Sequence, residues 1–147
     1  MNISLRPACD EDFAFVRDVY FATMRSIIES LFGWDQVREE ENFARFFRVD
    51  EARIITAEGR NVGWIQEQVD DTGINVGSLY VMQKMQRRGI GSQVLWTLLA
   101  HAADQSKAIT LAVVKINPAR HFYEKHGFRI THEDKYKFYM RADHECT

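Results

Sequence analysis

The chain of 147 residues, with 46% hydrophobic and 27% charged residues, has the size and composition of one globular domain spanning residues 1–147. Its net charge of −2 argues against nucleic acid as the main partner, and no apolar run is long enough to cross a bilayer. Residues 1–7 lack the basic-then-apolar layout of a secretion signal, so we expect a cytoplasmic protein.

Cysteine and histidine spacing gives no sign of a metal site. Cys9 and Cys146 lie near opposite ends of the chain, which favours reduced thiols over a disulfide framework. The histidines likewise lack metal-ligand spacing. We expect no bound metal and no acyl-cysteine chemistry.

The N-terminal third predicts a short strand and two helices. Residues 3–6 favour the strand. Three acids after it suit the positive end of a helix that runs from about residue 10 to residue 31 and ends at Gly33. Residues 34–47, acidic and then aromatic, predict a shorter second helix whose phenylalanines belong to the core.

From residue 53 the pattern changes to strands. Turn residues at 59–61 and 70–73 separate three strands over residues 53–58, 62–69 and 74–81. These segments predict consecutive antiparallel hairpins.

The second half predicts a crossover between parallel strands. An apolar stripe favours a helix over about 91–105, and the nearly wholly apolar segment 108–114 is typical of a central strand covered on both faces. Asn117, Pro118 and Gly127 punctuate a short helix.

Two final strands, over residues 128–131 and 135–140, are predicted after that helix. The fold class is therefore mixed α/β (α+β), with antiparallel hairpins first and a strand–helix–strand unit after them.

The turn that precedes the long helix has the features of an anion site. Gly89 and Gly91 permit backbone conformations that a side chain forbids, and Arg87 and Arg88 add positive charge. Successive amides at such a turn can form an anion-binding nest next to the helix dipole. The turn is thus either a phosphate or pyrophosphate site or an ordinary strand-to-helix connection. Val94 replaces the third glycine of a dinucleotide fingerprint.

Two motifs carry a resemblance to a known family. One is Gln86-Arg87-Arg88-Gly89-Ile90-Gly91, directly after a strand, and the other is Asn117-Pro118-Ala119-Arg120-His121-Phe122-Tyr123-Glu124-Lys125-His126-Gly127-Phe128. They resemble the [QR]-x-x-G-x-[GA] signature and the N-x-x-A-x-x-F-Y-x-x-x-G-F element of the GNAT superfamily of acyl-CoA-dependent N-acetyltransferases, the second with small shifts in spacing. The resemblance covers essentially the whole chain. It departs at residues 83–85, where members often carry a proline and an aromatic residue.

The resemblance implies a fold and a cofactor. The fold is a central mixed, mostly antiparallel sheet with a parallel, splayed strand pair, flanked by about four helices. The cofactor is acetyl-CoA (coenzyme A), with its pyrophosphate on the turn and its pantetheine arm along the preceding strand. The cofactor-binding residues implied are Leu79, Tyr80, Val81, Gln86, Arg87, Arg88, Gly89, Ile90, Gly91, Ser92, Asn117, Ala119, Phe122 and Lys125.

The implied reaction is transfer of acetyl from a thioester directly to an amine, which needs a proton acceptor and a proton donor. Tyr123 matches the family's acid, with packing beside Phe122 as the alternative. Glu67 is the candidate base, with a solvated strand carboxylate as the alternative; His121 and Tyr80 are further candidates. Strand alternation places Glu67 on the face opposite its two glutamine neighbours.

The acceptor is expected near Phe32 and Trp34, where acids at positions 35, 39, 40 and 41 form either a rim for a cationic amine or a solvated helix face. The expected partner is a small-molecule or peptide amine, with no nucleic acid and no membrane. A homodimer and a longer acyl donor are open. The rival function is a non-catalytic acyl-CoA-binding sensor or regulatory module.

Overall fold

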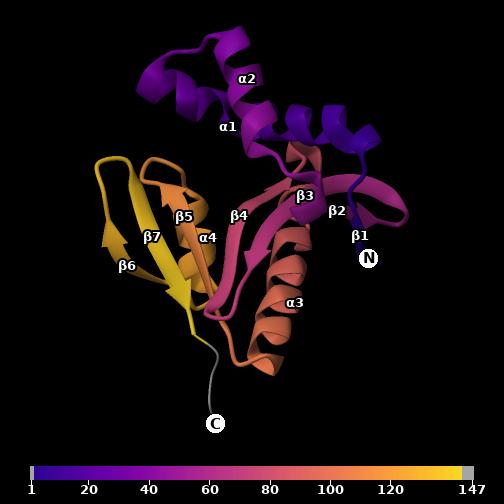
Figure 1. Cartoon of the computed structure of the whole chain (residues 1–147), viewed down its shortest axis with the longest axis vertical. Coiled ribbons are helices and arrows are strands. Elements are labelled where there is room, and N and C mark those ends of the chain that lie inside the picture. The colour runs from indigo at the N-terminus through magenta and orange to yellow at the C-terminus, as the bar shows by residue number, and fades with distance from the viewer. Residues whose placement is uncertain (1, 144–147) are drawn as a thin grey trace. The chain divides into compact units, whose positions relative to one another are not determined.

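The computed structural model of the protein describes residues 2–143, so Cys146 lies outside the described residues. Within them the strands form one seven-stranded sheet in the order β1-β2-β3-β4-β5-β7-β6 (Figure 1). The strands are β1 (Ile3–Pro7), β2 (Ala52–Ala57), β3 (Arg60–Val69), β4 (Gly73–Val81), β5 (Ala108–Val114), β6 (Arg129–Glu133) and β7 (Lys137–Ala142).

The pairing is mixed. β4 and β5 are parallel, whereas β1–β2, β2–β3, β5–β7 and β6–β7 are antiparallel. This confirms the predicted mostly antiparallel sheet with one parallel pair.

The predicted number of helices is also confirmed for residues 2–143. The helices are α1 (Phe13–Phe32), α2 (Gln36–Phe46), α3 (Ile90–Asp104) and α4 (Ala119–Lys125). The 3-10 turns Asp10–Asp12, Val49–Glu51 and Gln83–Met85 were not predicted. None of the described helices is both long and apolar enough to span a bilayer.

The first hairpin turn differs from the prediction. The turn was expected at residues 59–61, but Glu58 and Gly59 are the residues with left-handed φ angles, 52° and 79°. Two such residues suit a two-residue hairpin, because its twist matches that of the strands. β3 therefore begins at Arg60, earlier than predicted.

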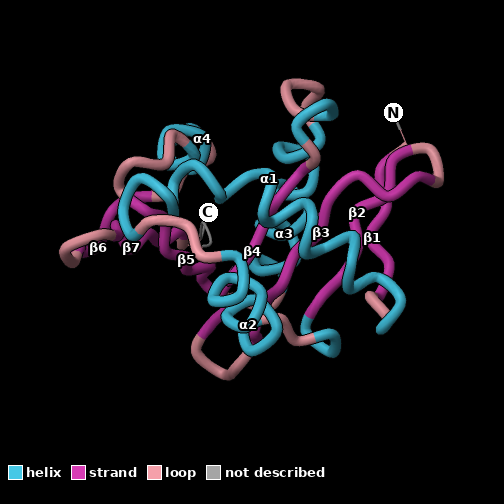
Figure 2. The backbone as a smooth tube through the Cα atoms, turned by 90° about the horizontal axis from the view of Figure 1, so that it is seen from above, coloured by secondary structure: helices cyan, strands magenta, loops and turns pink. Residues whose placement is uncertain are grey.

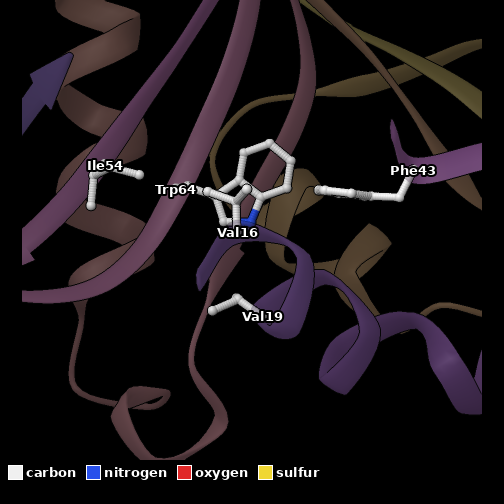
Figure 3. Close-up of a cluster of buried hydrophobic side chains, with 5 residues drawn as sticks. All are labelled: Val16, Val19, Phe43, Ile54 and Trp64. Atoms are coloured by element: carbon white, nitrogen blue, oxygen red, sulfur yellow. The ribbon is translucent and has the colours of Figure 1, made fainter. Parts of the chain in front are cut away.

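The chain folds into two compact units, of which the first comprises Met1–Gln66 and Ser78–Gly91. Its core holds side chains from both N-terminal helices and the first hairpin (Figure 3). Ile54 of β2 and Trp64 of β3 are cross-strand partners and are fully buried. Burial of side chains of this size stabilises the fold by roughly 1.5–3 kcal/mol each. The core residues drawn are Val16, Val19, Phe43, Ile54 and Trp64.

The predicted core phenylalanines of α2 are divided. Phe43 is buried, whereas Phe46 is 37% exposed. Residues three apart share one face of a helix, and the two ring centroids are 5.9 Å apart, so Phe46 lies at the edge of the same aromatic cluster.

A close backbone approach fixes the end of β4 against β3. A Cβ atom on Gly63 would lie 2.2 Å from the carbonyl oxygen of Tyr80 and 3.0 Å from Cα of Val81. The amide of Met82 donates to the carbonyl of Val62 at 2.8 Å. Glycine at position 63 is thus what allows the C-terminal end of β4 to lie against β3.

The second unit comprises Glu67–Gly77 and Ser92–Thr147. In it Gly73–Val76 of β4 run parallel to Ala108–Leu111 of β5, and α3 lies between these strands in sequence, as the crossover prediction requires. β5 also pairs with β7, and Figure 2 shows α4 beside these strands. One face of β5 is less covered than predicted, because Ala112 is exposed.

Candidate functional site

The parallel register ends before the residues expected to bind the cofactor's arm. Val76 is the last residue of β4 paired with β5, and Leu79, Tyr80 and Val81 follow it in the same strand. Leu79 and Tyr80 are half-buried, and Val81 is buried. In the described chain, the register of β4 with β5 therefore covers only Gly73–Val76.

The chain leaves β4 through an ordered turn. The amide of Met85 donates to the carbonyl of Met82 at 2.9 Å, and the amide of Gln86 donates to the carbonyl of Gln83 at 3.2 Å. The side-chain amide of Gln86 donates to the carbonyl of Val81 at 2.9 Å. Gln86 therefore ties the start of the anion loop, residues 86–91, back to the end of β4.

The anion loop leaves main-chain donors unused. Arg87 and Gly89 have left-handed φ angles of 65° and 81°. Within residues 2–143, the amides of Arg87, Arg88 and Gly89 donate to no protein group. α3 begins at the next residue, Ile90, and the first amides of a helix have no partner inside it. These donors, with the helix dipole, suit an anion.

The side chains around the loop divide by burial. Arg87 and Arg88 are exposed, whereas the side chain of Ile90 is buried, so Ile90 can offer a ligand only its main chain. A Cβ atom on Gly89 would meet nothing within 4 Å. The approach to the amides is therefore open, and the residues present fit a phosphate or pyrophosphate.

The segment around α4 bonds to itself. The side-chain oxygen of Asn117 accepts from the amide of Ala119 at 2.9 Å, as a capping side chain does. Pro118 stands at the N-cap, however, so α4 begins one residue later than predicted. Gly127, with a φ of 92°, follows the helix as predicted. In the same segment Ala119 and Phe122 are half-buried, and Lys125 is exposed.

Tyr123 lies in an apolar setting on α4. Its ring centroid is 5.4 Å from that of Phe122 and 5.6 Å from that of Phe128. Desolvation of the half-buried residue raises the pKa of Tyr123 to about 12. Its hydroxyl has no hydrogen-bond partner in the part of the chain that the structure describes. The phenol is therefore a neutral donor that is available to a ligand.

The candidate bases differ in their surroundings. Gln66 is buried, donates to the carbonyl of Phe46 and accepts from the amide of Arg48. Its neighbour Glu67 is half-buried on β3, and alternation directs it to the opposite face. The side chain of His121 is 71% exposed, 3.7 Å from a carboxylate oxygen of Glu124, as in a surface residue.

The candidate acceptor residues lie at the end of α1 and just after it. Phe32 is 55% exposed. Trp34 packs edge-on against Phe21 at 5.3 Å, and the guanidinium of Arg25 lies 4.8 Å from its ring centroid. Contacts with the protein thus already engage the indole of Trp34.

The structure adds polar groups that sequence reasoning missed. Ser78 is 3% exposed, and its hydroxyl has no hydrogen-bond partner in the described chain. The indole nitrogen of the fully buried Trp64 likewise has no hydrogen-bond partner there. Tyr20 of α1 was also missed, and its ring centroid lies 5.5 Å from that of Tyr80. Neither Ser78, which stands among apolar strand residues, nor Tyr20, which belongs to the apolar stripe of a helix, is marked as a site residue by the local sequence.

Comparison with known families gives one assignment. Residues 44–130 match the profile of the family described as "Acetyltransferase (GNAT) domain". No curated protein matches the sequence.

Solved structures with the same fold cover nearly the whole chain. The PaiA N-acetyltransferase of Thermoplasma acidophilum, in complex with coenzyme A, superposes with a TM-score of 0.79 at 17% identity, covering 98% of this chain and 100% of that chain. The ribosomal-protein-S18-alanine N-acetyltransferase of Escherichia coli gives 0.71 at 16% identity, covering 99% and 96%. Arabidopsis thaliana Naa50, in complex with the bisubstrate analogue CoA-Ac-MVNAL, gives 0.68 at 19% identity, covering 97% and 99%.

Proposed function

The chain belongs to the GNAT acetyltransferase family, and from this we propose that it transfers an acetyl group from acetyl-CoA directly to the amine of a small molecule or peptide. The observation that carries the proposal is the anion loop, where the amides of Arg87, Arg88 and Gly89 have no protein acceptor in residues 2–143. A pyrophosphate supplies the acceptors that these donors lack.

The loop is proposed to bind the pyrophosphate mainly through its main chain. The amides from Arg87 to Ser92 would donate to phosphate oxygens, because Ile90 has its side chain in the core and the two glycines have none. Arg87 and Arg88 would add charge from exposed positions, where salt screens much of it. Gln86 is proposed as a positioning residue, since its side chain already bonds the carbonyl of Val81.

The end of β4 is proposed to bind the pantetheine arm as an added strand would be bound. Leu79, Tyr80 and Val81 lie beyond the parallel register with β5. The carbonyl of Val81 already accepts from Gln86, so the arm would compete for its second lone pair or use the other main-chain groups.

The remaining cofactor contacts are proposed from the family's second motif. Asn117 would bond the arm with its amide group while its oxygen caps the helix. Ala119, Phe122 and Lys125 would line the same part of the donor.

Bound acetyl-CoA supplies an activated thioester and a thiol leaving group. The acceptor amine must lose a proton to react, and we propose that Glu67 accepts it, directly or through water. We propose that Tyr123 donates a proton to the departing sulfur. Its raised pKa, about 12, keeps the phenol protonated at neutral pH.

A thiol-release assay with acetyl-CoA and a panel of amines, including peptides, tests the function. We expect release of coenzyme A that depends on at least one amine. Binding of acetyl-CoA in calorimetry with no release on any amine would overturn the enzyme assignment. That outcome would favour an acyl-CoA-binding regulatory module instead.

A further inference from the structure

The acids around the turn between α1 and α2 are not equivalent. Asp35 caps α2, since its carboxylate accepts from the amide of Arg38 at 3.0 Å. Glu40 and Glu41 are exposed. Glu39 is only 7% exposed, which is rare for a carboxylate unless it has a partner. Of this group, Glu39 is therefore the one whose placement requires an explanation.

The arginine that pairs with Glu39 also bonds a second group. Its Oε2 accepts from Nε of Arg38 at 2.7 Å, while Nη2 of the same arginine donates to the carbonyl of Gly33 at 2.7 Å. The other carboxylate oxygen, Oε1, accepts from no group in residues 2–143. A nearly buried carboxylate with one unused oxygen can accept from a further cationic donor.

Phe43 lies one helical turn after Glu39 on α2, and it belongs to a group of aromatic rings of the same unit around Tyr20 of α1. The Tyr20 ring centroid lies 5.2 Å from that of Phe43, 5.5 Å from that of Tyr80 and 5.9 Å from that of Phe46. Burial and, second, the charge of Glu39 raise the pKa of Tyr20. The phenol therefore stays neutral, and its hydroxyl has no hydrogen bond within the described residues.

Aromatic rings and a carboxylate together recognise ammonium groups. A cation next to an aromatic face gains roughly 0.5–2 kcal/mol, more when it is desolvated. Phe46 is 37% exposed, and Tyr20 and Tyr80 are half-buried, so part of each side chain reaches the surface. Tyr80 also belongs to the strand end proposed to bind the donor's arm, so a cation at Tyr20 would lie next to that strand.

The chemistry of the transfer decides which ammonium belongs there. The nitrogen that attacks the thioester must lose its proton, and Glu67 is the carboxylate proposed to accept it, whereas Glu39 already accepts from Arg38. Glu39 thus suits a second ammonium that does not react. We propose that Glu39, with the rings of Tyr20, Phe46 and Tyr80, selects acceptors that carry a second positive charge, such as diamines. The inference rests on the proposed acetyl transfer.

A matched pair of acceptors tests it: 1,5-diaminopentane and 1-aminopentane share a carbon chain and differ by one amine. We expect wild-type kcat/KM to be about 10-fold higher for the diamine, from one charge-assisted contact plus a ring contact. Glu39→Gln should abolish that preference by raising the KM of the diamine. Glu40→Gln, the exposed neighbour, is the control and should retain the preference. A preference retained in Glu39→Gln, or absent in the wild type, overturns the inference.

A binding measurement separates this inference from the proposed function. Calorimetry with 1,5-diaminopentane in the presence of coenzyme A needs no transfer. We expect Glu39→Gln to weaken diamine binding about 10-fold, with unchanged coenzyme A affinity. Glu39→Asp, which retains the charge, should keep most of the diamine affinity; a loss equal to that of Glu39→Gln would show that packing, not charge, is responsible. Failure of transfer on all amines with this binding pattern intact would overturn only the proposed function.

Discussion

In the anion loop, the amides of Arg87, Arg88 and Gly89 donate to no group in residues 2–143, whereas the segment around α4 bonds to itself. There the side-chain oxygen of Asn117 accepts from Ala119 at 2.9 Å. Nδ1 of His126 lies 2.8 Å from the carbonyl of Phe122. The loop leaves main-chain donors unused within the described residues, whereas the segment around α4 uses its polar groups in contacts of its own.

This difference predicts how substitutions will act. Changes in the anion loop should alter ligand affinity and leave the free energy of unfolding nearly unchanged, because few protein contacts are lost. Changes around α4 should alter stability or the chemical step, because the contacts made there are internal. The predictions below test this division, from the largest expected effect to the smallest.

Gly89→Glu should raise the Kd for acetyl-CoA on the order of 100-fold, because a carboxylate next to the free amides repels and displaces the pyrophosphate. Isothermal titration calorimetry measures the effect. Gly59→Glu is the matched control: Gly59 has a φ of 79° against 81° for Gly89, and neither Cβ would meet an atom within 4 Å. Both variants carry the same strain and charge, so an equal loss of affinity in the two would refute the pyrophosphate assignment.

Tyr123→Phe should lower kcat about 100-fold at unchanged acetyl-CoA Kd, because it removes a proton donor and little volume. Tyr136→Phe, on the loop before β7, removes a phenol elsewhere in the same unit and should leave kcat unchanged. A drop in acetyl-CoA affinity with kcat intact would make Tyr123 a binding residue instead.

The pKa of Tyr123 adds a pH signature. The acid must be protonated, so its contribution is lost as pH rises through the folded-state pKa of about 12 rather than through the usual value of about 10. Wild-type kcat should therefore not decline near pH 10 on account of the acid, and absorbance titration of wild type against Tyr123→Phe should show one phenol that ionises near pH 12. Ionisation of that phenol near pH 10 would contradict its burial.

Sequence patterns were sufficient for most of the fold, and they predicted an anion site at residues 86–91. The strand at Ala108–Val114 and the crossover before it follow from apolar composition and helical period, and the loop follows from two glycines with two arginines. The hairpin turn was misplaced because Glu58, which has no turn preference, adopts a left-handed conformation beside Gly59. Backbone strain of this kind is imposed by the paired strands and is not visible in local composition.

The site was predictable only where residues are neighbours in sequence. Glu39 could not be separated from Glu40 and Glu41, because all three are acids in one run and only the folded structure shows that Glu39 is buried. The contact between Tyr20 and Tyr80 joins residues sixty positions apart, and no pattern in the chain reports it. Tertiary contacts therefore decide which acid and which aromatic ring can meet a ligand.

Substituting both loop arginines with alanine should raise the Kd for acetyl-CoA about 10-fold at low salt, a smaller effect than that of Gly89→Glu because both side chains are exposed. The difference from wild type should shrink as salt rises, which calorimetry in a salt series measures. Arg45→Ala with Arg60→Ala removes the same charge from other exposed positions of this unit and should change the Kd little. A salt-independent loss would indicate that the arginines support the loop structurally.

Substitution of Asn117 is expected to have the smallest effect. This residue could affect both stability and ligand affinity, because its side chain accepts from the amide of Ala119 and is also proposed to contact the pantetheine arm. Asn117→Ala should lower the free energy of unfolding by about 1 kcal/mol, the usual cost of losing such an acceptor. Asn117→Asp keeps an oxygen for the amide of Ala119 and should retain stability while losing the donating amide group. Urea unfolding and acetyl-CoA calorimetry separate the roles: weaker cofactor binding in both variants supports a direct contact, and unchanged affinity in Asn117→Asp would limit Asn117 to capping.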